Sequence, residues 1–102
     1  AEEGKSLEEI IDGLPRYAIV KRKIACPSER VFRVLRRIEE VFGAGAAVDR
    51  SDGVRLAWKR KWLQVRGSNT EPIVRVFAEA PDEEEARQLA DKALEEVKRL
   101  AE

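Results

Sequence analysis

The chain has 102 residues and a formal net charge of zero, and 39% of its residues are charged, against roughly 25% in an ordinary soluble domain. This length suits one domain with a small core, while a single cysteine, Cys26, and no histidine exclude an internal disulfide and a cysteine–histidine zinc site. No apolar run is long enough to span a bilayer and the first residues lack the pattern of a signal peptide, so we expect a soluble, cytoplasmic protein without a membrane partner.

The first predicted element is a short helix within residues 6–13, which has a Ser-x-x-Glu capping box and a terminal glycine. Pro15 then breaks the helix, because proline restricts its preceding residue to extended conformations, and a strand is predicted from about residue 17 to 26. We interpret residues 1–13 as a linker with a short helix, coming from a preceding domain, and residues 14–102 as the domain itself.

The second predicted element is an amphipathic helix from Pro27 to Gly43. Proline suits the first turn of a helix, and apolar residues then recur at spacings of three and four. The predicted apolar face consists of Val31, Val34, Leu35, Ile38, Val41 and Phe42. The arginines of the opposite face are interpreted as solvated, and we assign them no ligand.

Short alternating runs follow, which predict antiparallel strands. Residues 46–50 and 54–58 should form a hairpin around a turn at 51–53, and two further strands are expected at 62–66 and 73–80. The turn lacks the ligand spacing of a calcium loop, so we interpret it as a plain hairpin turn and assign no metal. The two tryptophans, Trp58 and Trp62, are expected to pack in the core.

The last predicted element is a helix that starts at a capping pair, Asp82 and Glu85, and continues to the end of the chain. The resulting order is β-α-β-β-β-β-α. Strands grouped between two long helices predict an α+β domain, with an antiparallel sheet of four to five strands and two main helices on one face.

The segment between the last two predicted strands is rich in groups that bind oxyanions. Arginine offers a planar fork of donors, and serine, threonine and asparagine add hydroxyl and amide donors. Gly67 can adopt backbone angles closed to other residues, so consecutive N–H groups could converge on an anion. The same composition is common in ordinary turns, and from these residues alone the two interpretations both stand. No base or nucleophile lies beside them, so the chemistry is binding and no residue is assigned a catalytic role.

The pattern Arg66-x-Ser68-Asn69-Thr70-Glu71-Pro72-x-x-Arg75 resembles the phosphate-binding loop of the α-D-phosphohexomutases, the phosphoglucomutase and phosphomannomutase family. Leu14-Pro15-x-Tyr17, Asp52-Gly53-Val54-Arg55 and Val76-Phe77-Ala78-Glu79-Ala80 extend the similarity over most of the chain. The resemblance is to the C-terminal domain. It implies a phosphate-binding site made of Arg66, Gly67, Ser68, Asn69, Thr70 and Arg75.

Members of this family have four domains and move a phosphoryl group between the 1- and 6-positions of a hexose, and the C-terminal domain holds the phosphate that is not reacting. The resemblance therefore implies a hexose phosphate, such as glucose or mannose 1- or 6-phosphate, and the other domains as partners. The family's phosphoserine loop, magnesium loop and sugar-recognition loop are absent from this sequence. We expect an excised or separately produced domain that is inactive alone and has no cofactor of its own, with magnesium bound elsewhere in the full-length enzyme.

The charge distribution leaves an alternative. Residues 1–13, 14–66 and 67–102 have formal charges of −4, +9 and −5, so a basic middle could attract an anion. The expected fold is similar to that of the TATA-box-binding protein repeats, and a small nucleic-acid-binding or protein-binding module is the alternative function. A single-phosphate site needs one converging cluster, whereas nucleic-acid binding needs a broad basic face. We expect no nucleic acid as partner.

Overall fold

The computed structural model describes residues 17–101, and the predicted linker and helix at residues 1–13 lie outside them. The elements follow the predicted order β-α-β-β-β-β-α. They are, in chain order, β1 (Ala18–Ala25), the short 3-10 helix η2 (Ser28–Arg30), α2 (Val31–Phe42), β2 (Ala47–Asp49), β3 (Val54–Ala57), β4 (Trp62–Gly67), β5 (Ile73–Ala80) and α3 (Glu83–Ala101). The predicted α+β class is confirmed.

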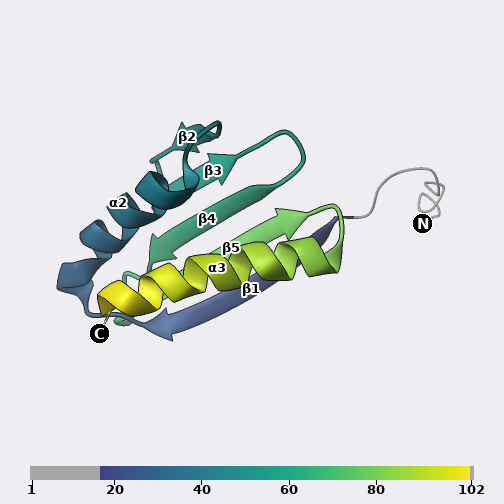
Figure 1. Cartoon of the computed structure of the whole chain (residues 1–102). Coiled ribbons are helices and arrows are strands. Elements are labelled where there is room, and N and C mark those ends of the chain that lie inside the picture. The colour runs from purple at the N-terminus through teal and green to yellow at the C-terminus, as the bar shows by residue number, and fades with distance from the viewer. Residues whose placement is uncertain (1–16, 102) are drawn as a thin grey trace.

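The five strands form one antiparallel sheet in the order β1-β5-β4-β3-β2 (Figure 1). Strands β2 to β5 follow one another as neighbours, as expected for strands joined by short turns. Strand β1 forms the edge beside β5, opposite the edge formed by β2. The chain can connect these two edges because the segment between β1 and β2, which contains α2, is long enough to cross the sheet. Strand β5 therefore lies between β1 and β4.

Alternation along the strands gives the sheet one buried face. On β5 the residues Val74, Val76, Ala78 and Ala80 are fully buried, while the residues between them are half-buried. Both helices cover this face (Figure 1) and complete the core through Val34 and Ile38 of α2 and Ala86, Leu89, Ala90, Ala93 and Val97 of α3. Each large aliphatic side chain buried in this way contributes roughly 1.5–3 kcal/mol.

Helix α2 departs from its prediction at its start and on its apolar face. It begins at Val31 and not at Pro27, because η2 takes the place of its first turn. Val41 was expected on the apolar face but is 40% exposed, while Val34 and Ile38 are fully buried. Phe32 is 70% exposed, with the guanidinium of Arg36 at 6.0 Å from the centroid of its ring. The buried stripe of α2 is therefore narrower than the apolar pattern of the sequence.

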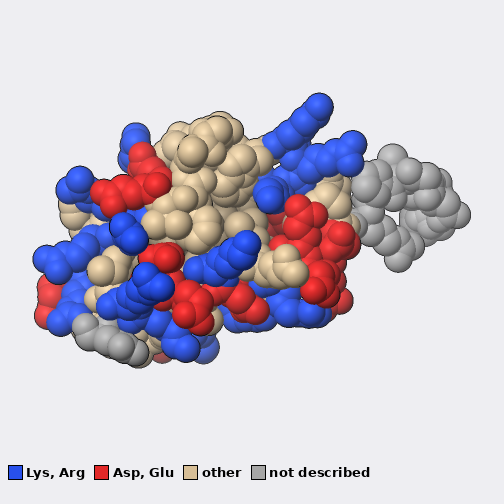
Figure 2. Space-filling view, viewed as in Figure 1, with Lys and Arg blue, Asp and Glu red and all other residues tan. Residues whose placement is uncertain are grey.

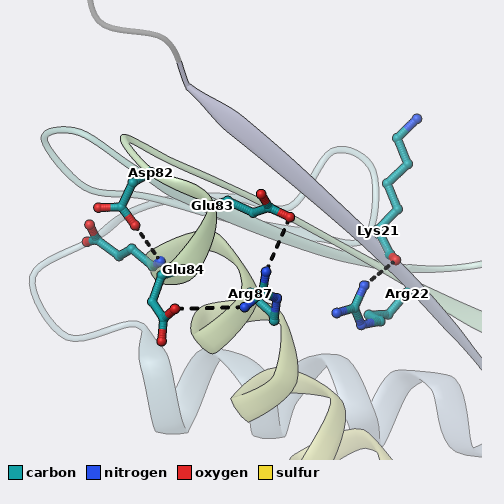
Figure 3. A network of polar contacts seen from close by, with 7 residues as sticks. Lys21, Arg22, Asp82, Glu83, Glu84 and Arg87 are labelled. Atoms are coloured by element: carbon teal, nitrogen blue, oxygen red, sulfur yellow. Dashed lines mark hydrogen bonds and ion pairs between the residues drawn. The ribbon is translucent and has the colours of Figure 1, made fainter.

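Helix α3 begins where its capping residue predicts. The Glu85 N–H donates to Asp82 Oδ1 at 2.8 Å, which satisfies one of the free N–H groups of the first turn. One turn further, Arg87 extends between Glu83 and Glu84, at 3.2 and 3.8 Å (Figure 3). These acidic side chains at the N-terminus also interact favourably with the helix dipole.

Three connections meet at one end of the sheet. The Cys26 N–H, just after β1, donates to the Pro72 carbonyl in the β4–β5 loop at 2.7 Å. Cys26 is buried, and burial raises the pKa of its thiol. The β2–β3 turn approaches β4 closely, since a Cβ added at Gly53 would lie 2.3 Å from the Val65 carbonyl oxygen. This end of the sheet carries the loop that was singled out in the sequence.

The face of the sheet without helices is polar and aromatic. Trp62 lies on this face, paired with Glu79 across the strands, so the expectation of a core position is wrong for Trp62. Its indole N–H donates to the Glu79 carboxylate. Trp58 does pack against the core. Among the described residues, no helix is long and apolar enough to cross a membrane.

Candidate functional site

The loop between β4 and β5 is an ordered turn organised by Ser68. The Ser68 N–H donates to the Ile73 carbonyl at 3.1 Å and closes the base of the loop. The Ser68 Oγ accepts hydrogen bonds from the N–H groups of Thr70 and Glu71, each at 3.2 Å, and lies 3.3 Å from the Thr70 hydroxyl. Asn69 and Thr70 are exposed at the tip. The hydrogen bonds of Ser68 therefore fix the backbone of the loop, while Asn69 and Thr70 remain exposed.

Three basic residues form a row across the sheet beside this loop. Arg66 of β4 pairs in register with Arg75 of β5, and Arg75 pairs with Lys23 of β1. Residues directly opposite each other on antiparallel strands lie about 4.5–5.5 Å apart at their Cα atoms. All three lie on the helix-free face, because their strand neighbours Val65, Val74 and Val76 are buried under the helices. We call Lys23, Arg75 and Arg66 the cation row.

The cation row is only partly neutralised. Arg66 Nη1 lies 2.9 Å from Asp52 Oδ2 in the β2–β3 turn. Within residues 17–101, Arg75 and Lys23 form no ion pair. Like charges directly opposite each other on neighbouring strands destabilise a sheet. The sheet therefore holds an uncompensated positive charge at the base of a loop rich in hydrogen-bond donors.

The comparison with known proteins decides the family. Residues 19–96 match the profile described as "Phosphoglucomutase/phosphomannomutase, C-terminal domain". The chain belongs to this family. The cation row and the loop lie within the matched range, so they are parts of the family's C-terminal domain.

Several phosphohexomutases are similar over nearly the whole chain. A probable phosphoglucosamine mutase of Methanopyrus kandleri is 38% identical over 102 residues, covering 99% of this chain and 23% of that protein. A phosphoglucomutase/phosphomannomutase of Thermococcus kodakarensis is 39% identical over 100 residues, covering 95% and 22%. A phosphoglucosamine/phosphogalactosamine mutase of Sulfurisphaera tokodaii is 38% identical over 104 residues, covering 100% and 22%.

A solved structure supports the fold. The crystal structure of a phosphoglucomutase/phosphomannomutase family protein from Burkholderia thailandensis superposes with a TM-score of 0.61 at 24% identity, covering 92% of this chain and 20% of that one. The chain thus spans between 20% and 23% of the length of these proteins. It corresponds to one domain of a longer enzyme architecture.

Gly67 fulfils a different role in this family domain from the one expected. It lies at the end of β4, and the glycines with positive φ among the described residues are Gly45 and Gly53. A Cβ added at Gly67 would lie 2.9 Å from Val31 Cγ1 at the start of α2. The expected nest conformation at Gly67 is therefore wrong. Because Gly67 has no side chain, the C-terminal end of β4 can pack against the start of α2.

The sequence pointed to Arg66 and Arg75 but not to three of their neighbours. Asp52 was interpreted as a plain turn residue, and Lys23 was assigned no part in the site. Phe77 was quoted for family resemblance alone, and the Arg66 guanidinium lies 5.5 Å from its ring centroid. The position of Lys23 depends on the register between β1 and β5, and that of Asp52 on the geometry of the β2–β3 turn, so no local pattern could have placed either of them beside the loop.

The basic turn at residues 59–61 lies at the other end of β4 from the loop. Lys61 contacts Glu85 at 3.6 Å and lies 5.7 Å from the centroid of the Trp58 ring. It takes no part in the cation row. On the side bearing the helices, basic and acidic side chains are intermixed and do not form one basic face (Figure 2).

The β2–β3 turn is organised by Asp49. Its Oδ1 accepts hydrogen bonds from the Ser51 hydroxyl at 2.7 Å and the Ser51 N–H at 2.9 Å. These bonds, the hydroxyl first, lower the pKa of Asp49. Among the described residues, no group of three His, Cys, Asp or Glu side chains could hold a metal ion. The turn is thus closed by its own hydrogen bonds at Asp49 and Ser51.

Ser51→Ala is expected to raise the pKa of Asp49 toward the ordinary value, because the hydroxyl donor is lost while the N–H remains. An Asp with a lowered folded pKa contributes stability above its unfolded pKa, about 3.9, and loses it as the pH falls. The stability difference between wild type and Ser51→Ala should therefore shrink in acid. An NMR titration of the Asp49 carboxyl carbon checks the shift, with Ser28→Ala as control. An unchanged Asp49 pKa would contradict it.

Proposed function

We propose that this chain is the phosphate-holding domain of a phosphohexomutase, and that it binds the non-transferred phosphate of a hexose phosphate during reversible 1,6-phosphoryl transfer. The proposed ligands are the cation-row arginines and the donors of the loop. They are Arg66, Gly67 through its backbone, Ser68, Asn69, Thr70 and Arg75. Lys23 adds a third charge beside Arg75.

The cation row is the observation that carries this proposal. Folding places like charges side by side at a cost, and a phosphate dianion offsets that cost by accepting charge-assisted hydrogen bonds from both arginines. Each such bond is worth roughly 1.5–3 kcal/mol. The loop supplies hydroxyl and amide donors next to the same point. One compact anion fits this arrangement.

The rest of the reaction belongs to other parts of a longer enzyme. The relatives are named as mutases of phosphorylated glucose, mannose, glucosamine or galactosamine, and this chain covers 22–23% of their length. We propose that the phosphoryl-transferring serine, the magnesium ion and most sugar contacts lie in the remaining domains, and that the isolated chain is inactive. A cytoplasmic location is part of the same proposal.

The alternative, a nucleic-acid-binding module, is less well supported. Single-stranded nucleic acids bind to sheets through bases stacked on free aromatic rings. On the helix-free face, the guanidinium of Arg55 lies 4.8 Å from the Trp62 ring centroid, and that of Arg66 lies over Phe77. Both rings are therefore already covered by arginines and do not offer a free surface on which a base could stack.

An NMR titration of the ¹⁵N-labelled chain tests the proposal. Glucose 1-phosphate and mannose 6-phosphate should shift amides centred on residues 66–70, with a Kd weaker than micromolar because most sugar contacts are supplied by other domains. Glucose without phosphate serves as the matched control and should shift none of them. Shifts with a DNA oligonucleotide but not with either sugar phosphate would overturn the proposal in favour of the alternative.

A further inference from the structure

The position of Asp52 is fixed from three sides. Gly53 next to it has φ +70 and approaches β4 so closely that an added Cβ would lie 2.6 Å from Arg66 Cβ. Gln64 Nε2 donates to the Asp52 carbonyl at 3.1 Å, which ties the turn to β4 a second time. The Asp49–Ser51 hydrogen bonds close the turn on its other side. The backbone of Asp52 is therefore held against β4 before any ligand arrives.

The Asp52 carboxylate and the Phe77 ring hold the Arg66 guanidinium between them. Nη1 donates to Asp52 Oδ2 at 2.9 Å, and the guanidinium carbon Cζ lies 5.5 Å from the Phe77 ring centroid. Phe77 is on β5 and Asp52 on the β2–β3 turn, so the two contacts come from opposite sides of β4. An arginine has five N–H donors, and this ion pair engages one nitrogen only. The other donors stay available.

We infer that Asp52 is a positioning residue, which orders the Arg66 guanidinium so that its remaining donors meet the phosphate. This inference rests on the proposed function. An unrestrained arginine side chain loses conformational entropy when it binds a ligand. An ion pair that already orders the side chain in the free protein reduces this loss on binding. Asp52 also places a negative charge near the anion, which by itself weakens binding. The two effects change the affinity for phosphate in opposite directions. The change in affinity when Asp52 is replaced therefore shows which effect is larger.

Asp52→Ser tests the inference, because serine is common in turns and its shorter side chain removes the carboxylate from Arg66. We expect the Kd for glucose 1-phosphate to rise roughly three- to tenfold, the cost of ordering one long side chain. Glu95→Gln is the control for charge, since it removes one exposed negative charge from α3, in the other layer of the domain. Its Kd should change by less than about twofold.

A second readout needs no ligand. The ¹⁵N heteronuclear NOE of the Arg66 Nε–H should fall in Asp52→Ser and stay unchanged in Glu95→Gln. If wild type binds glucose 1-phosphate and Asp52→Ser binds it equally well or more tightly, the positioning role is overturned while the proposed function stands. If Arg66 is as ordered in Asp52→Ser as in wild type, the positioning role is overturned as well. If wild type does not bind the sugar phosphate at all, both proposals fail.

Discussion

Gly53→Ala is expected to lower the free energy of unfolding by about 2–5 kcal/mol. The first contribution is conformational, because φ is +70 at Gly53 and the left-handed region costs an L-residue roughly 1–2 kcal/mol. The second is steric: the new Cβ would lie 2.3 Å from the Val65 carbonyl oxygen and 2.6 Å from Arg66 Cβ, and overpacking of this kind costs about 1–3 kcal/mol. Urea denaturation followed by tryptophan fluorescence measures the loss.

Gly45→Ala separates the two contributions. Gly45 has φ +76, but nothing lies within 4 Å of its added Cβ, so it should lose about 1–2 kcal/mol through conformation alone. The difference between the two losses in the free energy of unfolding measures the steric cost that arises from the close approach of the β2–β3 turn to β4. Equal losses in Gly45→Ala and Gly53→Ala would contradict the close approach on which the placement of Asp52 depends.

Arg75→Gln is expected to weaken binding of glucose 1-phosphate by roughly tenfold or more, the worth of one charge-assisted hydrogen bond. The same change should leave the free energy of unfolding unchanged or raise it by up to about 0.5 kcal/mol, since Arg75 lies between Arg66 and Lys23 and its removal relieves two like-charge contacts. Affinity by NMR titration and stability by urea denaturation should therefore move in opposite directions.

Lys92→Gln is the control for net charge, because Lys92 is an exposed residue of α3 in the other layer of the domain. It should leave affinity for glucose 1-phosphate within about twofold of wild type. A similar loss of affinity in Lys92→Gln and Arg75→Gln would mean that the phosphate responds to net charge alone. A clear loss of stability in Arg75→Gln would contradict the strain that we assign to the cation row.

The elements that bury one face completely were predicted correctly from the sequence. The strand at 73–80 has the predicted bounds, because every second residue along it, from Val74 to Ala80, is apolar and buried. Val41 and Trp62 were misplaced, since spacing alone does not tell how wide the buried stripe of a helix is or which face of a strand a tryptophan occupies. Trp62 can lie on the open face because Glu79 accepts its indole N–H.

The candidate site was predicted in its local part only. Arg66 and Arg75 flank one loop and were both named as phosphate ligands, and the register of β4 and β5 places them opposite each other. Lys23 and Asp52 reach the same place from distant segments, and their positions depend on register and turn geometry that no local pattern encodes. The same holds for Gly67, whose neighbour Val31 lies on a helix far back in the chain.

The edge position of β1 has a consequence for how the domain folds. Strands β2 to β5 can pair successively through short connections, but Lys23 meets Arg75 only after the chain between β1 and β5 has closed into a loop. Closing such a loop costs entropy before any contact is gained, so distant pairings of this kind slow folding. We expect the cation row to be completed at the docking of β1, so that recovery of phosphate affinity during refolding reports on that late event.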